Sequence, residues 1–151
     1  MNMELTIETP DMRNMKINAE EGMKEVLYRA MVKMEELAKN KAPVDTGNLK
    51  NRIHLTPEMI GAKEYILSDG VSYGIDLEYG NRPHNVSWEP IKAWIKRKGI
   101  RTTEAGIFLM TKYVVEKIKK EGVNAQPFFR PALHEVQTKW LPLIKKQVFG
   151  N

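Results

Sequence analysis

The chain has 151 residues, of which 42% are hydrophobic and 28% charged, which is enough for one domain with a hydrophobic core. It contains no cysteine, which excludes disulfides and thiolate metal sites and fits assembly in a reducing cytosol. Residues 1–91 carry a net charge of −4 and residues 92–151 a net charge of +9. Either the basic half binds a polyanion such as DNA, or the acidic and basic faces of neighbouring subunits meet.

The N-terminal third predicts a strand and then a long helix. Residues 3–8 alternate apolar and polar side chains, as a strand does, and residues 8–14 break that pattern. From about Ala19 to Lys41 the apolar residues recur at steps of three and four, which predicts an amphipathic helix. Pro43 ends this helix, because the residue before a proline disfavours the helical conformation.

The middle of the chain predicts an antiparallel sheet of three to four short strands. Residues 52–56, 64–68 and 72–80 are short apolar segments, and glycines separate them as turn residues do.

The C-terminal half predicts two or three further helices. A short helix covers residues 88–98 with Ser87 as its cap, and a longer one runs from about Thr103 to Glu121. The last helix has Pro131 at its first position, and Pro142 interrupts or kinks it. The burial candidates of the longer helix are Ile107, Phe108, Tyr113, Val114, Val115 and Ile118. The expected fold is therefore α+β, with the long helix packed on the sheet in one domain over residues 1–151.

The tripeptide Asp45-Thr46-Gly47 is also the signature of aspartic proteases, which need two carboxylates that share a proton. Here a long helix precedes the tripeptide, and Asn48 follows it where those proteases have a small residue. We interpret it as a turn in which Asp45 and Thr46 bind nearby backbone N–H groups and Gly47 is left-handed.

No other motif indicates catalysis or a bound cofactor. The three histidines, His54, His84 and His134, lie far apart in the sequence and outside any metal-binding spacing. There is no glycine-rich phosphate loop, nucleophile elbow or helix-turn-helix pattern. We therefore expect no enzyme activity, no cofactor and no metal, and any DNA contact should be electrostatic and non-specific.

Four segments together resemble one known family. They are "APVDTGNLKNRI" (42–53), "SYGIDLEYG" (72–80), "IKAWIKRKGI" (91–100) and "QPFFRPAL" (126–133), in the family's order and spacing. The family is the tail-component, or tail-completion, family of tailed phages, typified by the tenth gene product of a lambdoid phage. The resemblance covers roughly residues 20–145. Arg52, Gly74 and Asn81 depart from it, since serine, alanine and threonine are usual there.

The resemblance implies a small α+β virion protein of the tail neck at the head–tail junction, assembled in the host cytoplasm. Such a protein forms a ring, commonly a hexamer, that completes the tail. Its partners would be other copies of itself, the tail tube protein, the head connector and neck proteins, and genomic DNA held non-specifically in the channel. A non-specific DNA-binding accessory protein is the alternative. A membrane is not an expected partner, because no apolar run approaches the ~18 residues of a membrane span and the N-terminus lacks the pattern of a secretory signal.

The resemblance assigns roles in assembly rather than in catalysis. Asp45, Thr46 and Gly47 would shape the turn, and Glu78, Tyr79 and Gly80 would end a strand at a packing or subunit contact. Phe128, Phe129 and Arg130 would anchor the loop before the last helix, which has Pro131 at its first position, although ordinary core is an equal interpretation of the two phenylalanines. From charge alone, Arg130 could pair with Glu78 within or between subunits. The candidates for a DNA channel or a basic subunit interface are Lys96, Arg97, Lys98, Lys119 and Lys120.

Overall fold

The computed structural model describes residues 10–56 and 66–150, with the side chains of the first helix described from Asn18 onward. Most of these residues are helical. The elements in chain order are α1 (Pro10–Lys41), α2 (Asn48–Arg52), β1 (His54–Leu55), β2 (Leu67–Ser68), α3 (Gly74–Tyr79), α4 (Trp88–Arg97), α5 (Glu104–Glu121), α6 (Phe129–Glu135), the π-helical η2 (Val136–Trp140) and α7 (Leu141–Phe149). The strand predicted over residues 3–8 lies outside the described residues.

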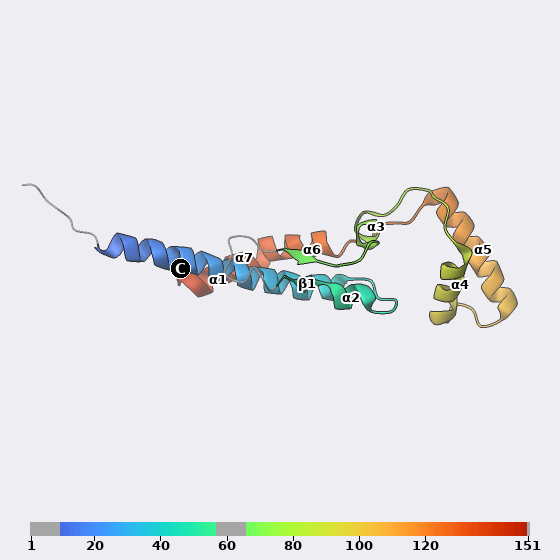
Figure 1. Cartoon of the computed structure of the whole chain (residues 1–151), viewed down its shortest axis with the longest axis horizontal. Helices are drawn as coiled ribbons and strands as arrows, with labels where there is room; N and C mark the ends of the chain where they lie inside the picture. The colour runs from blue at the N-terminus through green and yellow to red at the C-terminus, as the bar shows by residue number, and fades with distance from the viewer. Residues whose placement is uncertain (1–9, 57–65, 151) are drawn as a thin grey trace, which may run out of the picture.

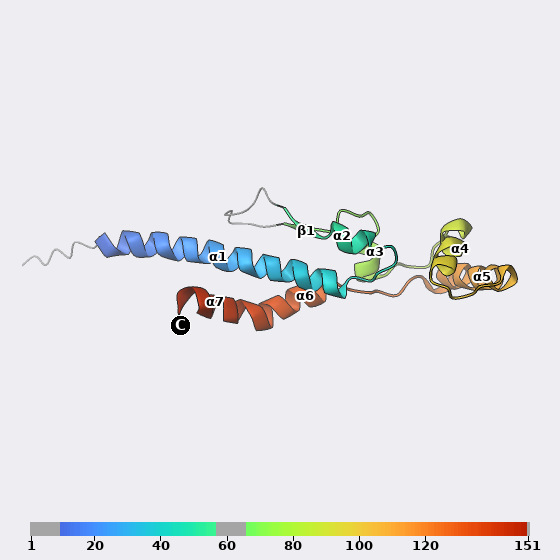
Figure 2. The same ribbon diagram turned by 90° about the horizontal axis from the view of Figure 1, so that it is seen from below.

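The molecule is elongated and has two parts (Figures 1 and 2). In the first part, which we call the body, α1 runs beside α6, η2 and α7, and α2, α3 and the two strands lie near the end of α1. The second part is the hairpin of α4 and α5 at the far end of the molecule. Two extended segments join them, and Asn81 and Val123 bridge these segments through two backbone hydrogen bonds of 2.9 Å each. We call these two segments, residues 80–87 and 122–128, the stalk.

The body has its core along the inner side of α1. One buried cluster joins the end of α1 to α2 and to the start of α6, and consists of Ala38, Ala42, Leu49, Ile53, Phe128 and Ala132. A second cluster joins the middle of α1 to η2 and α7, and consists of Val26, Ala30, Val136 and Ile144. The predicted amphipathic helix is thus confirmed, and its alanines allow α6 and η2 to approach the α1 backbone closely.

Prolines mark the start of the first helix and the interruption of the last one. Helix α1 begins at Pro10, earlier than predicted, and proline fits the first position because its missing N–H would have no partner inside the helix. Pro142 does interrupt the last helix, as predicted. It cannot donate to a carbonyl four residues earlier, and the backbone before it widens into η2, where the Leu141 N–H binds the Val136 carbonyl.

The predicted sheet is wrong in extent. Only β1 and β2 form, paired antiparallel with His54 opposite Ser68 and Leu55 opposite Leu67. The Leu55 N–H also donates to the Glu35 carboxylate at 2.9 Å, which holds β1 on α1.

The predicted strand over residues 72–80 is the helix α3. Its apolar residues alternate like those of a strand, but three of them, Tyr73, Ile75 and Tyr79, are exposed. The buried residues are instead Gly74 and Glu78, four apart on one helical face. The buried side chain of α3 is therefore a carboxylate whose partners lie elsewhere in the chain. A hydrophobicity pattern cannot detect such a residue.

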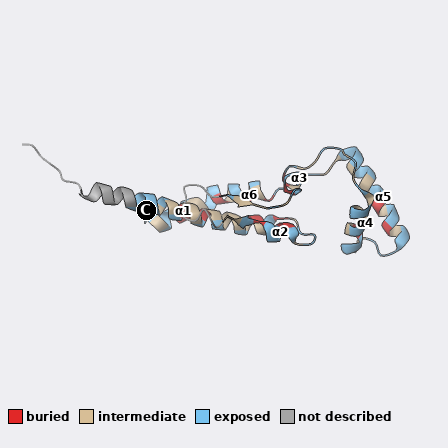
Figure 3. Ribbon diagram, viewed as in Figure 1, coloured by how far each residue is buried: buried red, intermediate tan, exposed pale blue. Residues whose placement is uncertain are grey.

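Helices α4 and α5 match the prediction closely, with two exceptions. Ser87 precedes α4, but its side chain makes no capping hydrogen bond. Phe108 and Tyr113 of α5, predicted to be buried, are 56% and 59% exposed, although the Phe108 ring lies 5.2 Å from the Trp88 ring of α4. The buried residues of α5 are Ile107 and Thr111. In Figure 3 the hairpin carries mostly exposed residues on its outer sides.

Candidate functional site

Glu78 is the polar centre of the body and is only 4% exposed. One carboxylate oxygen accepts the N–H groups of Phe128 and Phe129 at 2.7 and 2.9 Å. The other accepts the backbone N–H of Arg130 at 2.9 Å and its side-chain Nε at 3.0 Å. The carboxylate therefore caps the first turn of α6 from a helix 50 residues earlier in the chain. We call this arrangement the Glu78 clasp.

Arg130 completes the clasp. Its guanidinium donates to the Glu78 backbone carbonyl at 2.7 Å and stacks on the Tyr79 ring at 4.5 Å. The Glu78–Arg130 pair suggested by the sequence thus exists within one chain. Pro131 follows as the third residue of α6 rather than the first, because the helix already begins at Phe129.

The clasp sets the charge state of Glu78. Burial alone would raise the pKa of this carboxyl group, but the N–H groups of Phe128, Arg130 and Phe129 and the Arg130 side chain outweigh that effect. The pKa of Glu78 therefore lies below its ordinary value of 4.5. The group stays ionised at neutral pH and serves to hold α3 against α6.

Gly80 ends α3 with a positive φ of 76° and lies against the returning stalk segment. A Cβ at Gly80 would approach the Val123 carbonyl oxygen to 2.7 Å, which no ordinary packing allows. Phe128, at the other end of that segment, is fully buried, and its ring stacks on the Phe129 ring at 4.6 Å between centroids. These residues thus fix where the stalk leaves the body.

The Asp45-Thr46-Gly47 segment is a turn between α1 and α2, as predicted. Gly47 has a φ of 82° and precedes α2 as its cap residue, and the Thr46 hydroxyl accepts a weak hydrogen bond from the Asn48 N–H at 3.4 Å. Asp45 differs from the expectation, because its carboxylate pairs with Arg97 at the end of α4 at 2.6 Å. This hydrogen bond with Arg97 lowers the pKa of Asp45. The turn therefore joins the body to the hairpin.

The predicted basic residues fall into two groups. Lys96, Arg97 and Lys98 end α4, where each has a partner in the same chain: Glu104 for Lys96 at 2.9 Å, Asp45 for Arg97, and the Val44 carbonyl for Lys98 at 2.7 Å. Lys119 and Lys120 lie exposed in the last turn of α5. Lys96 thus pairs within the hairpin, Arg97 and Lys98 contact the turn after α1, and the second group faces solvent.

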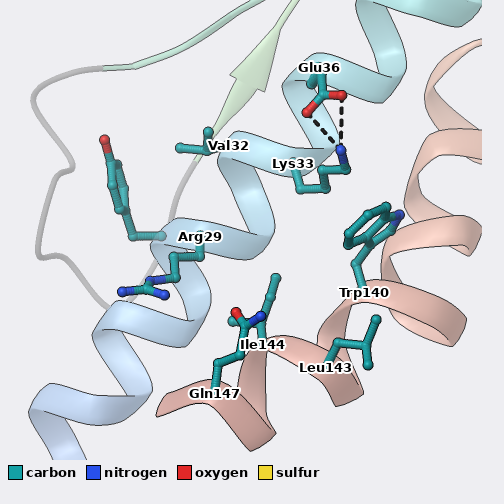
Figure 4. Close-up of a pocket in the computed structure, with 9 residues that line it drawn as sticks. Arg29, Val32, Lys33, Glu36, Trp140, Leu143, Ile144 and Gln147 are labelled. Carbon is teal, nitrogen blue, oxygen red and sulfur yellow. Dashed lines mark hydrogen bonds and ion pairs between the residues drawn. The ribbon is translucent and has the colours of Figure 1, made fainter.

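A shallow hollow of about 380 Å³ lies between α1 and α7 on one side of the body (Figure 4). Lys33 reaches from α1 over the Trp140 ring at 4.2 Å and also pairs with Glu36 at 2.8 Å. Leu143 and Val32, both exposed, line the same hollow. It is the outer part of the α1–α7 packing seam and brings together no group of titratable side chains that suggests chemistry.

A metal site or a membrane span finds no support in residues 10–56 and 66–150. Among them no three His, Asp or Glu side chains gather to hold a metal ion. In the same described residues no helix is both long and apolar enough to cross a membrane.

Exposed apolar side chains are the most prominent feature of the described surface. Thirteen large ones are exposed: Met23, Val32, Val44, Ile66, Tyr73, Ile75, Tyr79, Phe108, Leu109, Tyr113, Leu133, Leu143 and Phe149. Of the twelve buried hydrophobic residues among those described, four are alanines. The described surface thus carries more large hydrophobic side chains than the core does, and such side chains mark contact surfaces where they gather into a patch.

Comparison of the chain with protein-family models, with curated proteins and with solved structures returned no match.

Proposed function

We propose that this protein is a structural, ring-forming subunit of the neck of a phage or prophage tail. It completes the tail tube at the head–tail junction and acts by self-association and docking, not by catalysis. The proposal starts from the four segments that resemble the tail-completion family.

The observation that carries the proposal is that these four segments lie in contact as two pairs. Segment 72–80 supplies Glu78 and segment 126–133 supplies the α6 turn that Glu78 caps, with hydrogen bonds of 2.7 to 3.0 Å. Segment 42–53 supplies Asp45 and segment 91–100 supplies Arg97, joined at 2.6 Å. Chance matches scattered along a chain would not be expected to meet in this way, so the contacts support a single fold signature.

The surface supports the self-association part of the proposal. Helix α5 has apolar residues on the side toward α4, where Ile107 is buried, and also on its outer side, where Leu109 and Tyr113 are exposed. In a ring, the outer residues would be covered by neighbouring subunits. The opposite net charges of the two halves of the sequence fit a head-to-tail contact, since such a contact joins different faces of identical subunits.

Native mass spectrometry and sedimentation velocity on the full-length protein test the proposal. We expect a closed oligomer, six subunits according to the resemblance, visible as rings by negative-stain electron microscopy. A protein that stays monomeric up to high concentration, with tail tube protein added as well, would overturn the proposal.

The alternative is a non-specific DNA-binding accessory protein, favoured by the exposed lysines of α5, Lys112, Lys117, Lys119 and Lys120. The free protein should then bind DNA of any sequence with an affinity that falls steeply with salt, in proportion to the phosphates contacted. Absence of binding at low salt would remove this alternative and leave the ring unaffected.

A further inference from the structure

Two exposed apolar patches of this chain have opposite charge, and they lie on different parts of the molecule. The first is on α5 in the hairpin, and the second is on α3 in the body (Figure 1). We propose that the α5 patch of one copy binds the α3 patch of the next copy, and that this contact builds the ring. The inference rests on the proposed function and specifies its interface.

The α5 patch is apolar at its centre and mainly basic around it. Leu109 and Tyr113 are 65% and 59% exposed and lie one turn apart on the same helical face. Lys112, Lys117 and Lys120 flank this pair along the helix, and Glu116 is the one acidic residue between them. Helix α4 covers the opposite side of α5, where Ile107 and Thr111 are buried, so the patch faces away from its own hairpin.

The α3 patch also has an exposed apolar pair at its centre, but the residues around it are mainly acidic. Ile75 and Tyr79 are 72% and 64% exposed and also lie one turn apart. Asp76 is exposed beside them, and Asp69 lies near the start of α3 with one carboxylate oxygen accepting the Val71 N–H at 3.2 Å. Two cations lie nearby. Arg130 stacks on one face of the Tyr79 ring and pairs with Glu78, and Arg52 of α2 donates to the Gly70 carbonyl at 3.2 Å. Segment 66–80 contains three acidic residues and no lysine or arginine.

A second copy of the chain is therefore the partner that fits both patches. Each patch offers an aliphatic side chain and a tyrosine at helical spacing, and tyrosines are enriched where interfaces bury both apolar and polar surface. The lysines of α5 would meet the aspartates of α3, which sets orientation and register. Because the two patches differ, the contact is heterologous, and repeating it gives a ring or a filament rather than a dimer.

The absence of cysteine from the chain gives a direct test. We would mix the Asp76→Cys variant with the Lys117→Cys variant, and separately with the Lys112→Cys variant to cover both helix directions, and oxidise mildly. Neither Asp76 nor these lysines belongs to the two apolar pairs, so both pairs stay intact in the variants. We expect a mixed disulfide dimer in at least one mixture, in about tenfold higher yield than in a control mixture of Asp76→Cys with Lys50→Cys on α2. The excess is expected because a formed contact gives the thiols an effective concentration near the millimolar range.

A double variant would carry Asp76→Cys together with whichever lysine substitution gave the cross-link. It should form a ladder of covalent oligomers that ends at the number of subunits in the ring. Mixed dimers at or below the control yield, in a protein that sedimentation shows to be oligomeric, would overturn this interface and leave the ring function standing. Control-level yield in a protein that is also monomeric, with tail tube protein present, would overturn both.

Discussion

At the scale of single residues, Glu78 is the buried polar residue that joins α3 to α6. Its carboxylate satisfies three backbone N–H groups at the start of α6 and one side-chain N–H of Arg130. A buried carboxylate is tolerated only where its oxygens have such partners. The clasp therefore explains why a charged residue occupies an inner position of α3.

We expect the substitution Glu78→Gln to destabilise the folded chain by roughly 2 to 3 kcal/mol, because hydrogen bonds from N–H groups to a charged acceptor are the strong ones. Glutamine keeps one acceptor oxygen but places an NH₂ group against N–H donors. Urea unfolding followed by circular dichroism measures the change. Glu21→Gln, at an exposed position of α1 outside both patches, is the matched control and should change stability little.

The same variant tests the pH dependence of the clasp. Because the folded-state pKa of Glu78 is lowered, its ionised form contributes fully above about pH 4.5, the ordinary value. That contribution is lost as the pH falls through the lowered pKa. Glu35, Asp45, Glu104 and Glu135 also have lowered pKa values, so both proteins lose stability in acid. The unfolding midpoints of the two proteins should converge as the pH falls from 7 to 3, and a constant difference would contradict the assignment.

At the scale of elements, the stalk and the Asp45 turn decide how the hairpin is attached to the body. Gly47 and Gly122 have nearly equal positive φ angles, 82° and 79°. Their surroundings differ, since a Cβ at Gly47 would have only the Asn51 amide at 3.7 Å nearby. A Cβ at Gly122 would overlap the Asn81 carbonyl oxygen across the stalk.

We therefore expect Gly122→Ala to be clearly more damaging than Gly47→Ala. The backbone strain of a left-handed alanine, about 1 to 2 kcal/mol, is common to both variants, and the steric overlap affects only Gly122. Thermal unfolding of both variants beside the wild type measures the difference. Equal losses of stability would mean that the two stalk segments do not lie as close as the Asn81–Val123 bridge places them.

The ion pair between Asp45 and Arg97 is exposed, so its contribution to stability should stay under about 1 kcal/mol. We expect Asp45→Asn and Arg97→Gln each to have a small effect, and the double variant to cost less than the sum of the two. A double-mutant cycle in low salt measures this coupling, and 1 M NaCl should remove most of it. A peptidase at Asp45 would behave differently, because Asp45→Asn would then abolish an activity while leaving stability nearly unchanged.

The same elements indicate what the sequence alone could predict. Hydrophobic periodicity located α4, α5 and the C-terminal end of α1 well, because these helices bury one continuous face and glycine or proline follows them closely. It failed at α3, where the buried positions are a glycine and a glutamate whose partners lie 50 residues away. It also failed for Phe108 and Tyr113, since a periodic pattern cannot distinguish an apolar face that is buried within the chain from one that is exposed. The candidate pair Glu78–Arg130 came from opposite charge alone. No local pattern in the sequence indicated that Arg97 is the partner of Asp45.

At the scale of the whole molecule, the body and the projecting hairpin give an elongated shape (Figure 2). The core of the described residues is small, since four of its twelve buried hydrophobic residues are alanines. Small cores support only modest stability in an isolated chain. Association through the α5 and α3 patches would add to that stability, because a ligand that binds only the folded state shifts the unfolding equilibrium, and here the ligand is another copy of the chain.

The melting temperature should therefore rise with protein concentration. Each tenfold increase in protein concentration adds up to about 1.4 kcal/mol per subunit to the free energy of unfolding when every subunit is bound. For a chain of this size, that corresponds to a rise in melting temperature of roughly 2 to 5 °C. Leu109→Glu, which places an acidic group in the centre of the α5 patch, should abolish the concentration dependence and lower the melting temperature to the monomer value. Leu133→Glu, at an exposed position of α6 outside both patches, is the matched control and should retain it. Differential scanning fluorimetry across two decades of concentration measures all three proteins, and a wild-type melting temperature independent of concentration would contradict stabilisation by self-association.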